Sequence, residues 1–97
     1  MDVLFRGRRL QRCFEDSRTA AREWGPVVGA RYIERIHQMV TAGRLADLFA
    51  LRALDFHPLA GDRAGQYAMR LSGRMRLIVT IPEDGMLMVE EVVDYHG

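Results

Sequence analysis

Two histidines in the second half of the chain carry the groups needed for acid–base chemistry on a phosphodiester. His57 precedes Pro58, which favours an extended backbone, and His96 follows a strand-like run over residues 86–93. An imidazole has an unperturbed pKa near ~6.5, so its neutral form accepts a proton and its charged form donates one. Metal-free cleavage of RNA needs one group to take the 2′-hydroxyl proton and another to protonate the leaving 5′-oxygen. His57 and His96 are therefore a candidate acid–base pair.

Arginine would supply the positive charge for the same reaction. All 14 basic residues are arginines, although the net charge is only +1, so composition alone does not indicate a nucleic-acid partner, and a GC-rich coding bias explains the lack of lysine. Position is more informative. Arg76 lies between Met75 and Leu77 in an alternating run, so it is expected to point away from the core and to stabilise a phosphorane rather than to be merely solvated. Arg70 and Arg74, near the same predicted hairpin, are expected to contact the RNA backbone.

Three further residues each have two interpretations. Tyr95 either caps the core or stacks on an unpaired base, as aromatic residues of RNA-binding proteins do. Asp94 either caps the end of a strand, or orients an imidazole or contacts the RNA. Arg63 is expected to pair with Asp62 or with a carbonyl in its own turn, and a phosphate contact is the second interpretation. His37 is expected to be a surface histidine without a role.

The composition predicts one ordinary globular domain over residues 1–97. The chain is 48% hydrophobic and 28% charged, with one cysteine and three histidines, which is typical of a folded protein. The scattered histidines lack zinc-ligand spacing, and no glycine-rich loop precedes a predicted helix, so neither a metal nor another cofactor is expected. The absence of a long apolar stretch or an N-terminal signal pattern predicts no membrane association. The single cysteine, Cys13, is expected to be reduced, as in the cytoplasm.

The first half of the chain has the periodicity of helices. A short strand is expected over residues 2–5, followed by a helix over residues 8–23 whose buried stripe is formed by Leu10, Cys13 and Phe14. Pro26 suits the first turn of a second helix, Gly43 is placed to end it, and another helical turn is expected over residues 45–51. The second helix is predicted to bury four residues: Tyr32, Ile33, Ile36 and Val40.

The second half has the alternation of β-strands. Strands are expected over residues 66–71, 74–81 and 86–93, with turns at Ser72-Gly73 and at residues 82–85. Glu90 and Glu91 interrupt both alternating sets of the last strand, so the pattern does not determine which of its side chains face the helices. The predicted fold is α+β, with an N-terminal helical hairpin packed on one face of an antiparallel sheet. The opposite face is expected to be concave and polar. The residues expected to face the helices are Tyr67, Met69, Leu71, Met75, Leu77, Val79 and Ile81.

Three segments of the second half resemble the motifs of a known family. Residues 57–67, HPLAGDRAGQY, resemble the pattern H-x-L-K-G-D-R-x-G-x-[WYF], residues 72–77, SGRMRL, resemble S-G-N-[WY]-R-[LI], and residues 93–96, VDYH, resemble a terminal x-D-Y-H. The chain is similar on these residues to the HigB-like (plasmid maintenance killer protein) branch of the RelE/ParE toxins. It departs from the family at Ala60, which replaces a lysine, and at Arg74-Met75, which replaces N-[WY].

The resemblance implies a RelE-like fold and a bacterial toxin paired with an antitoxin, expected to be a helix-turn-helix protein. HigB-like toxins cut messenger RNA on the ribosome without a metal. Our hypothesis for this chain is 2′-hydroxyl attack, with a 2′,3′-cyclic phosphate and a 5′-hydroxyl as the products. The family's catalytic residues fall on His57, Arg76, Asp94, Tyr95 and His96. Two alternatives remain open: a ParE-like toxin that binds DNA gyrase, and a degenerate toxin retained as an antitoxin-binding partner.

Overall fold

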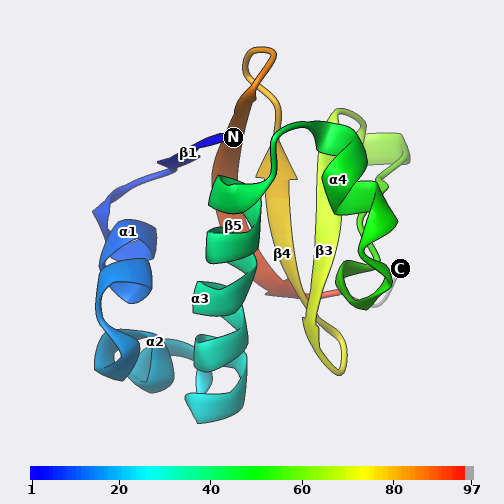
Figure 1. The fold of residues 1–97 in the computed structure, drawn as a ribbon. Helices are drawn as coiled ribbons and strands as arrows, with labels where there is room; N and C mark the ends of the chain where they lie inside the picture. The colour runs from blue at the N-terminus through cyan, green and yellow to red at the C-terminus, as the bar shows by residue number, and fades with distance from the viewer. Residues whose placement is uncertain (96–97) are drawn as a thin grey trace.

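The computed structural model describes residues 1–95, which form an α+β fold. Its sheet has the strand order β1-β5-β4-β3-β2, and all neighbours are antiparallel except β1 and β5. The strands are β1 (Asp2–Phe5), β2 (His57–Pro58), β3 (Gln66–Ser72), β4 (Met75–Thr80) and β5 (Met86–Asp94). The helices are α1 (Arg8–Glu15), α2 (Ser17–Trp24), α3 (Pro26–Thr41) and α4 (Leu45–Ala50), with short 3₁₀ turns η1 (Arg52–Leu54) and η2 (Gly61–Arg63). The predicted fold class, with helices on one face of the sheet, is confirmed (Figure 1).

The first predicted helix is in fact two helices, because Asp16 interrupts it. Asp16 has an extended backbone, and its carboxylate accepts hydrogen bonds from the Arg18 backbone N–H at 3.0 Å and from the Thr19 hydroxyl at 3.1 Å. The bond from Arg18 is the main reason why the pKa of Asp16 lies below its ordinary value. An aspartate side chain that caps the next helix competes with continued helical bonding. The prediction of one helix over residues 8–23 is therefore wrong.

Helix α3 lies across the sheet and buries a stripe that differs slightly from the predicted one. Tyr32, Ile36 and Met39 are fully buried, whereas Val40 is 51% exposed. The reason is the helical period, since positions i, i+4 and i+7 share a face and the next residue has turned away from it. The Tyr32 hydroxyl donates a 2.8 Å hydrogen bond to the Leu10 carbonyl, which ties α3 to α1; burial raises the pKa of this phenol.

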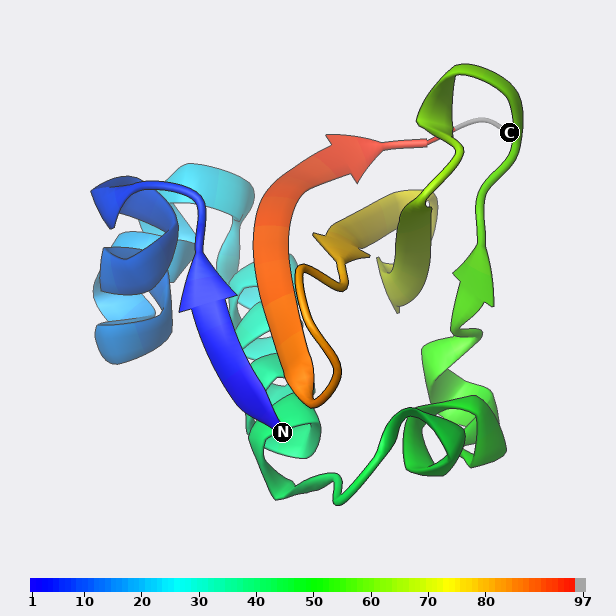
Figure 2. The same cartoon turned by 90° about the horizontal axis from the view of Figure 1, so that it is seen from above.

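The inner face of the sheet is apolar, as predicted. The strands supply Met69, Leu71, Leu77, Val79, Leu87 and Val89 to one buried cluster with the helices. The ambiguity at Glu90 and Glu91 is resolved by a β-bulge, because Ile78 pairs with Glu91 while Val79 pairs with Val89. An extra residue reverses the alternation and bends the strand. Figure 2 shows β5 curving strongly along its length toward the loop that carries η2.

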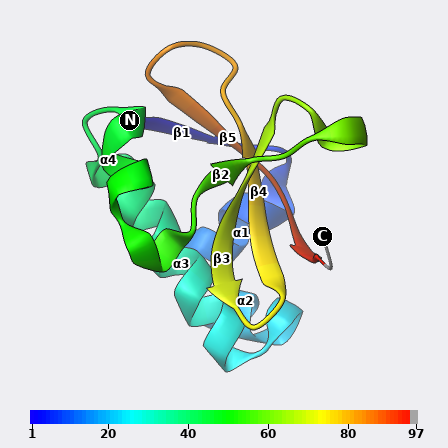
Figure 3. The same ribbon diagram turned by 90° about the vertical axis from the view of Figure 1, so that its right-hand side faces the viewer.

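The outer face of the sheet is partly covered, contrary to the expectation of an open polar face. Leu59, Ala68 and Ile78 form a second buried cluster, against which Val93 and Tyr95 pack. Leu59 belongs to the loop after β2, which passes over this side of the sheet while α3 and α4 lie on the other (Figure 3). Ala68 was not assigned to either side by the alternation argument, and Ile78 was overlooked because the neighbouring arginines and threonine mark its face as polar.

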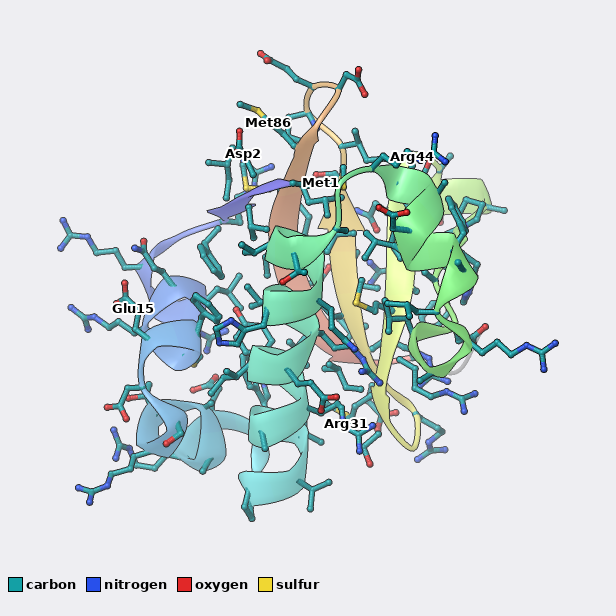
Figure 4. All side chains as sticks on the ribbon, in the orientation of Figure 1. Met1, Asp2, Glu15, Arg31, Arg44 and Met86 are labelled. Carbon is teal, nitrogen blue, oxygen red and sulfur yellow. The ribbon has the colours of Figure 1, made fainter. Side chains whose placement is uncertain are left out.

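The N-terminal strand is anchored to the end of α3. The Met1 amino group donates hydrogen bonds to the carbonyls of Met39 and Val40 at 3.2 and 3.0 Å, near the label of Met1 in Figure 4. A positive charge at this position complements the negative end of the helix dipole. Within residues 1–95, no helix has the length and apolar character that crossing a membrane requires.

Candidate functional site on the outer face of the sheet

The outer face presents its side chains in cross-strand rows. Residues at paired positions of neighbouring strands point to the same face of a sheet. The pairing therefore places the predicted residues in two adjacent rows. The first row is His57, Ala68, Ile78 and Glu91, and the second is Arg70, Arg76 and Val93.

His57 lies at the edge of the first row and is held by Asp55. The Nδ1 atom of His57 is 2.7 Å from the backbone carbonyl oxygen of Asp55 and 3.8 Å from its carboxylate oxygen Oδ1. Asp55 has φ of 46°, the only positive φ of a non-glycine residue in the part of the chain that the structure describes. The His57 side chain remains 43% exposed. Sequence reasoning missed Asp55, although an acid two residues before a candidate catalytic histidine was a usable signal.

Arg70 and Arg76 lie directly opposite each other on β3 and β4. The Nη2 atom of Arg70 is 3.8 Å from Oδ2 of Asp55, so Asp55 lies between Arg70 and His57. Arg76 instead donates through Nη1 to the carbonyls of Gly73 at 2.6 Å and Met75 at 3.0 Å. Like charges at opposite positions of a sheet repel each other. The pair is therefore suited to an anion.

Arg63 has structural partners other than the predicted ones. Its Nη1 atom donates to Gln66 at 2.9 Å and lies 3.2 Å from a carboxylate oxygen of Glu91. Its guanidinium carbon also lies 5.9 Å from the centre of the Tyr95 ring, within the range of a cation–π contact. The expected partner, Asp62, is replaced by Glu91 because the bulge in β5 directs Glu91 to the outer face.

The end of β5 brings one further predicted residue, Tyr95, to this face, whereas Asp94 pairs with Met75 of the helical side. Tyr95 packs against the cluster of Leu59, Ala68 and Ile78, and its backbone N–H donates to the Arg74 carbonyl at 2.9 Å. Oδ1 of Asp94 lies 3.5 Å from Nε of Arg74, which belongs to the β3–β4 turn rather than to β4 as predicted. Ala68 therefore has His57 beside it on β2 and Tyr95 packed near it. His96 lies outside the described residues.

One strand separates His57 from Arg76. These residues lie on β2 and β4, with β3 between them, and in different rows. With ~4.8 Å between neighbouring strands, their Cα atoms are more than ~9 Å apart. Arg70 is the nearer arginine, since it lies on the neighbouring strand one row away. The described residues thus group His57 with Asp55 and Arg70, and Arg76 adjoins that group through Arg70.

A polar cluster at the bulge borders the face. Glu90 accepts a hydrogen bond from the Thr80 hydroxyl at 2.6 Å and two from Arg6, both at 3.0 Å. The bonds from Arg6 are the largest cause of a pKa of Glu90 below its ordinary value, and the same pairing raises the pKa of Arg6. This cluster joins the residue after β1 to β4 and β5. Sequence reasoning missed it because the three residues are remote in the chain.

The arginines on and beside the outer face are unevenly compensated. Arg63, Arg70 and Arg74 lie within 4.0 Å of the carboxylates of Glu91, Asp55 and Asp94, respectively. Among residues 1–95, no such carboxylate lies beside Arg76, whose guanidinium donates to carbonyl oxygens. A carbonyl oxygen orients a guanidinium without cancelling its formal charge. Over the same residues, no group of three His, Cys, Asp or Glu side chains is placed to hold a metal ion.

The fold is that of known toxin structures. No family model and no curated protein matches the chain. The YoeB–YefM complex from Staphylococcus aureus matches with a TM-score of 0.61 and 18% identity over 100% of this chain and 98% of that chain. YafQ from E. coli matches with a TM-score of 0.60 and 14% identity over 94% and 89%. A YoeB/ParE toxin from Agrobacterium tumefaciens matches with a TM-score of 0.57 and 18% identity over 99% and 100%.

These matches show that the chain has a RelE-like fold. The shared features are helices packed on one face of a mostly antiparallel five-stranded sheet. YoeB, YafQ and the YoeB/ParE toxin are the particular structures to which it is similar. At identities of 14–18% the likeness concerns the fold and not the chemistry of the site.

Proposed function

We propose that the protein is the toxin of a toxin–antitoxin pair and cleaves messenger RNA on the ribosome, as a member of the HigB-like branch. The observation that carries the proposal is the pair of opposite arginines, Arg70 and Arg76, in the row next to His57. Two guanidinium groups side by side favour an anion between them, and an imidazole nearby can move a proton. A phosphodiester meets both requirements.

The reaction proceeds by attack of a 2′-hydroxyl on the adjacent phosphorus. The new bond joins the 2′-oxygen to phosphorus, the bond from phosphorus to the 5′-oxygen breaks, and the products are a 2′,3′-cyclic phosphate and a 5′-hydroxyl. His57 and His96 share the two proton transfers, and Arg76 stabilises the negative charge of the phosphorane. Because the charge of Arg76 meets only carbonyl oxygens among its recorded partners, it is available to a phosphate.

Tyr95 and Asp94 position the nucleotide, and the remaining arginines contact the RNA backbone. The Tyr95 ring already lies under Arg63 and packs against the cluster of Leu59, Ala68 and Ile78, so part of its surface is occupied within the protein. Stacking with a base would use the remaining face or the ring edge. Arg63, Arg70 and Arg74 are partly neutralised by carboxylates, so they contribute less to binding than Arg76 does.

A second protein is the proposed inhibitor. The chain has the fold of YoeB, which one of the matched structures contains in a complex with YefM. This likeness supports an antitoxin as a partner, and the resemblance to HigB-like toxins supports a helix-turn-helix protein in that role.

The test is cleavage of messenger RNA in a translating extract. The wild-type protein should shorten the message, and sequencing of the cut ends should give 2′,3′-cyclic phosphates and 5′-hydroxyls. His57→Ala and His96→Ala should abolish cleavage while leaving the fold intact. His37→Ala is a matched control, because this exposed histidine lies on α3, on the helical side of the sheet. Continued cleavage by both catalytic variants would overturn the assignment.

The same experiment separates the alternatives when DNA supercoiling is measured in parallel. Inhibition of gyrase with intact messenger RNA would identify a ParE-like toxin. Intact messenger RNA with normal supercoiling, together with binding of the antitoxin, would identify a degenerate toxin.

A further inference from the structure

Asp55 contacts His57 with two different groups, and the contacts have different chemical consequences. The carbonyl oxygen of Asp55 lies 2.7 Å from Nδ1 of His57, and its carboxylate lies 3.8 Å from the same nitrogen. A peptide carbonyl can only accept a hydrogen bond. Nδ1 must therefore be the donor, and a neutral His57 ring then carries its lone pair on Nε2.

We propose that Asp55 is a positioning residue that holds neutral His57 as the Nδ1–H tautomer, so that Nε2 of His57 is the base in the reaction. This inference rests on the proposed function and assigns the two proton transfers. The 2′-hydroxyl proton moves to Nε2 of His57 as the 2′-oxygen bonds to phosphorus, and the leaving 5′-oxygen takes its proton from the imidazolium of His96. The imidazolium formed at His57 then lies beside the Asp55 carboxylate.

The backbone conformation of Asp55 is what aims the carbonyl. With φ of 46° and ψ of 45°, Asp55 is in the left-handed region and ends the turn η1. Its own N–H donates to the Arg52 carbonyl at 3.0 Å, which holds the peptide unit before it. Aspartate tolerates this region better than most residues, because its short side chain bonds locally. A strained backbone conformation next to a site is typical of a functional constraint.

A buried arginine holds this turn against the sheet. Arg35 of α3 is 1% exposed and donates to the Ala53 carbonyl at 3.2 Å and to the Arg70 carbonyl at 2.8 Å. Ala53 belongs to η1. Arg70 lies two residues after Ala68, the β3 residue that pairs with His57. The two bonds therefore set the position of Asp55 relative to β3. Arg70 in turn approaches the Asp55 carboxylate from β3.

The groups around His57 agree with this assignment. Among residues 1–95, the charged group beside His57 is the Asp55 carboxylate on its own segment. Arg70 on β3 contacts that carboxylate from its other side. The neighbour on β3 at the paired position is Ala68, which is apolar. A carboxylate 3.8 Å from Nδ1 stabilises a positive ring without removing the proton from Nε2, and Arg70 lies 3.8 Å from the same carboxylate.

The test reads the tautomer directly from the ¹⁵N and ¹H correlations of the histidine rings at a pH above neutrality. Free histidine prefers the Nε2–H tautomer, so the expected Nδ1–H pattern is the opposite of the default. The His57 signals are assigned by their loss in His57→Gln. An Nε2–H pattern for His57 in the wild-type protein overturns the inference, whether or not the protein cleaves RNA.

Two variants separate the carbonyl from the carboxylate. Asp55→Gly keeps access to the left-handed backbone, so it should retain the Nδ1–H pattern and lower cleavage roughly tenfold through loss of the carboxylate. Asp55→Val disfavours that backbone, so it should shift the ring toward Nε2–H and lower cleavage by at least ~100-fold. Circular dichroism checks that both variants are folded, and an Nδ1–H pattern in folded Asp55→Val contradicts the role of the carbonyl. If Asp55→Val does not fold, the His57 ring spectra of the wild-type protein and of Asp55→Gly still show whether the ring is the Nδ1–H tautomer.

Failure of the inference and failure of the proposed function are distinguishable. Wild-type cleavage with an Nε2–H ring leaves the nuclease intact and removes the role of Asp55. An Nδ1–H ring without any cleavage keeps the positioning and removes the nuclease.

Discussion

The two faces of the sheet use the same residue type in opposite ways. On the helical side, Arg35 is 1% exposed and its guanidinium is bonded to the carbonyls of Arg70 and Ala53 and to the side chain of Gln38. On the outer side, Arg76 is bonded through one nitrogen to two carbonyls of its own hairpin. The first arginine joins three elements that are remote in sequence, and the second joins none.

The difference contrasts a fully buried arginine that joins distant elements with a half-buried arginine whose bonds stay within its own hairpin. Desolvation lowers the pKa of Arg35, the expected direction for a cation taken out of water. Such a group is retained only where its donors are satisfied. Arg76 is half-buried, and its hydrogen bonds to residues 1–95 are made through Nη1. Stability should therefore depend on Arg35, and activity on Arg76.

The largest expected effect is on stability, from Arg35→Met. Removing the guanidinium leaves the carbonyls of Arg70 and Ala53 without their donor in a buried place, so the free energy of unfolding should fall by about 3 kcal/mol. Urea denaturation followed by circular dichroism measures the change. Arg31→Met is the control on the same helix, since Arg31 is 42% exposed beside Glu34 and extends from α3 in Figure 4. The control should change stability by less than about 0.5 kcal/mol. Equal losses for both variants would remove the contrast between buried and exposed arginine.

The next effect is on activity, from Arg76→Gln. Loss of one cation aimed at a developing negative charge should lower messenger cleavage by about 100-fold. The free energy of unfolding should fall by less than about 1 kcal/mol, because only bonds to nearby turn carbonyls are lost. Cleavage rates in the translating extract and urea denaturation test the two parts. Arg52→Gln, at an exposed position in η1, should leave cleavage unchanged; unaltered cleavage by Arg76→Gln would show that the outer arginine is merely solvated.

A smaller, pH-dependent effect is expected from Glu90→Gln at the edge of the outer face. The pKa of Glu90 is lowered mainly by its hydrogen bonds from Arg6 and also by the bond from Thr80. A carboxylate with a lowered pKa stabilises the fold above its unfolded pKa, and this contribution is lost as the pH falls through the folded value. The variant should therefore be less stable by about 1 kcal/mol at neutral pH. The difference should shrink below about pH 4, and a difference that grows in acid would contradict this account.

The smallest effect on stability is expected from Arg74→Gln. The side chains of Arg74 and Asp94 are 67% and 51% exposed and 3.5 Å apart, and such surface pairs contribute about 0.5 kcal/mol or less. Binding of RNA by the variant should nevertheless weaken and become less sensitive to salt, because one phosphate contact is removed. Filter binding at several salt concentrations measures this change. An unchanged salt dependence would exclude Arg74 from the RNA-binding surface.

Local patterns were sufficient for most of the fold. The alternation of residues 66–71 and 74–81 predicted both β3 and β4 and the face that packs on the helices, since a period of two assigns side chains to faces directly. Asp16 was the main error in the helical half. Its side chain ends one helix and caps the next, a choice that depends on local hydrogen bonds rather than on apolar spacing.

The residues around the candidate site were harder to predict because they belong to remote segments. His57, Arg76, Arg63 and Tyr95 were singled out by residue type and motif, but their partners were not. Arg63 meets Glu91, which is 28 positions away, only because the bulge turns Glu91 outward. The partner of His57 was close in sequence, yet its role depends on the left-handed backbone of Asp55, which no apolar pattern reveals.

The amino-acid sequence by itself determined the α+β class, the inner apolar faces and the candidate chemistry, because side-chain period and residue type are local properties. Only the tertiary structure decided which arginine is buried and which stays on the outer face, how β5 changes face at its bulge, and that Asp55 lies between His57 and Arg70. These outcomes depend on register and on contacts between distant segments, where the balance of desolvation and hydrogen bonding is settled.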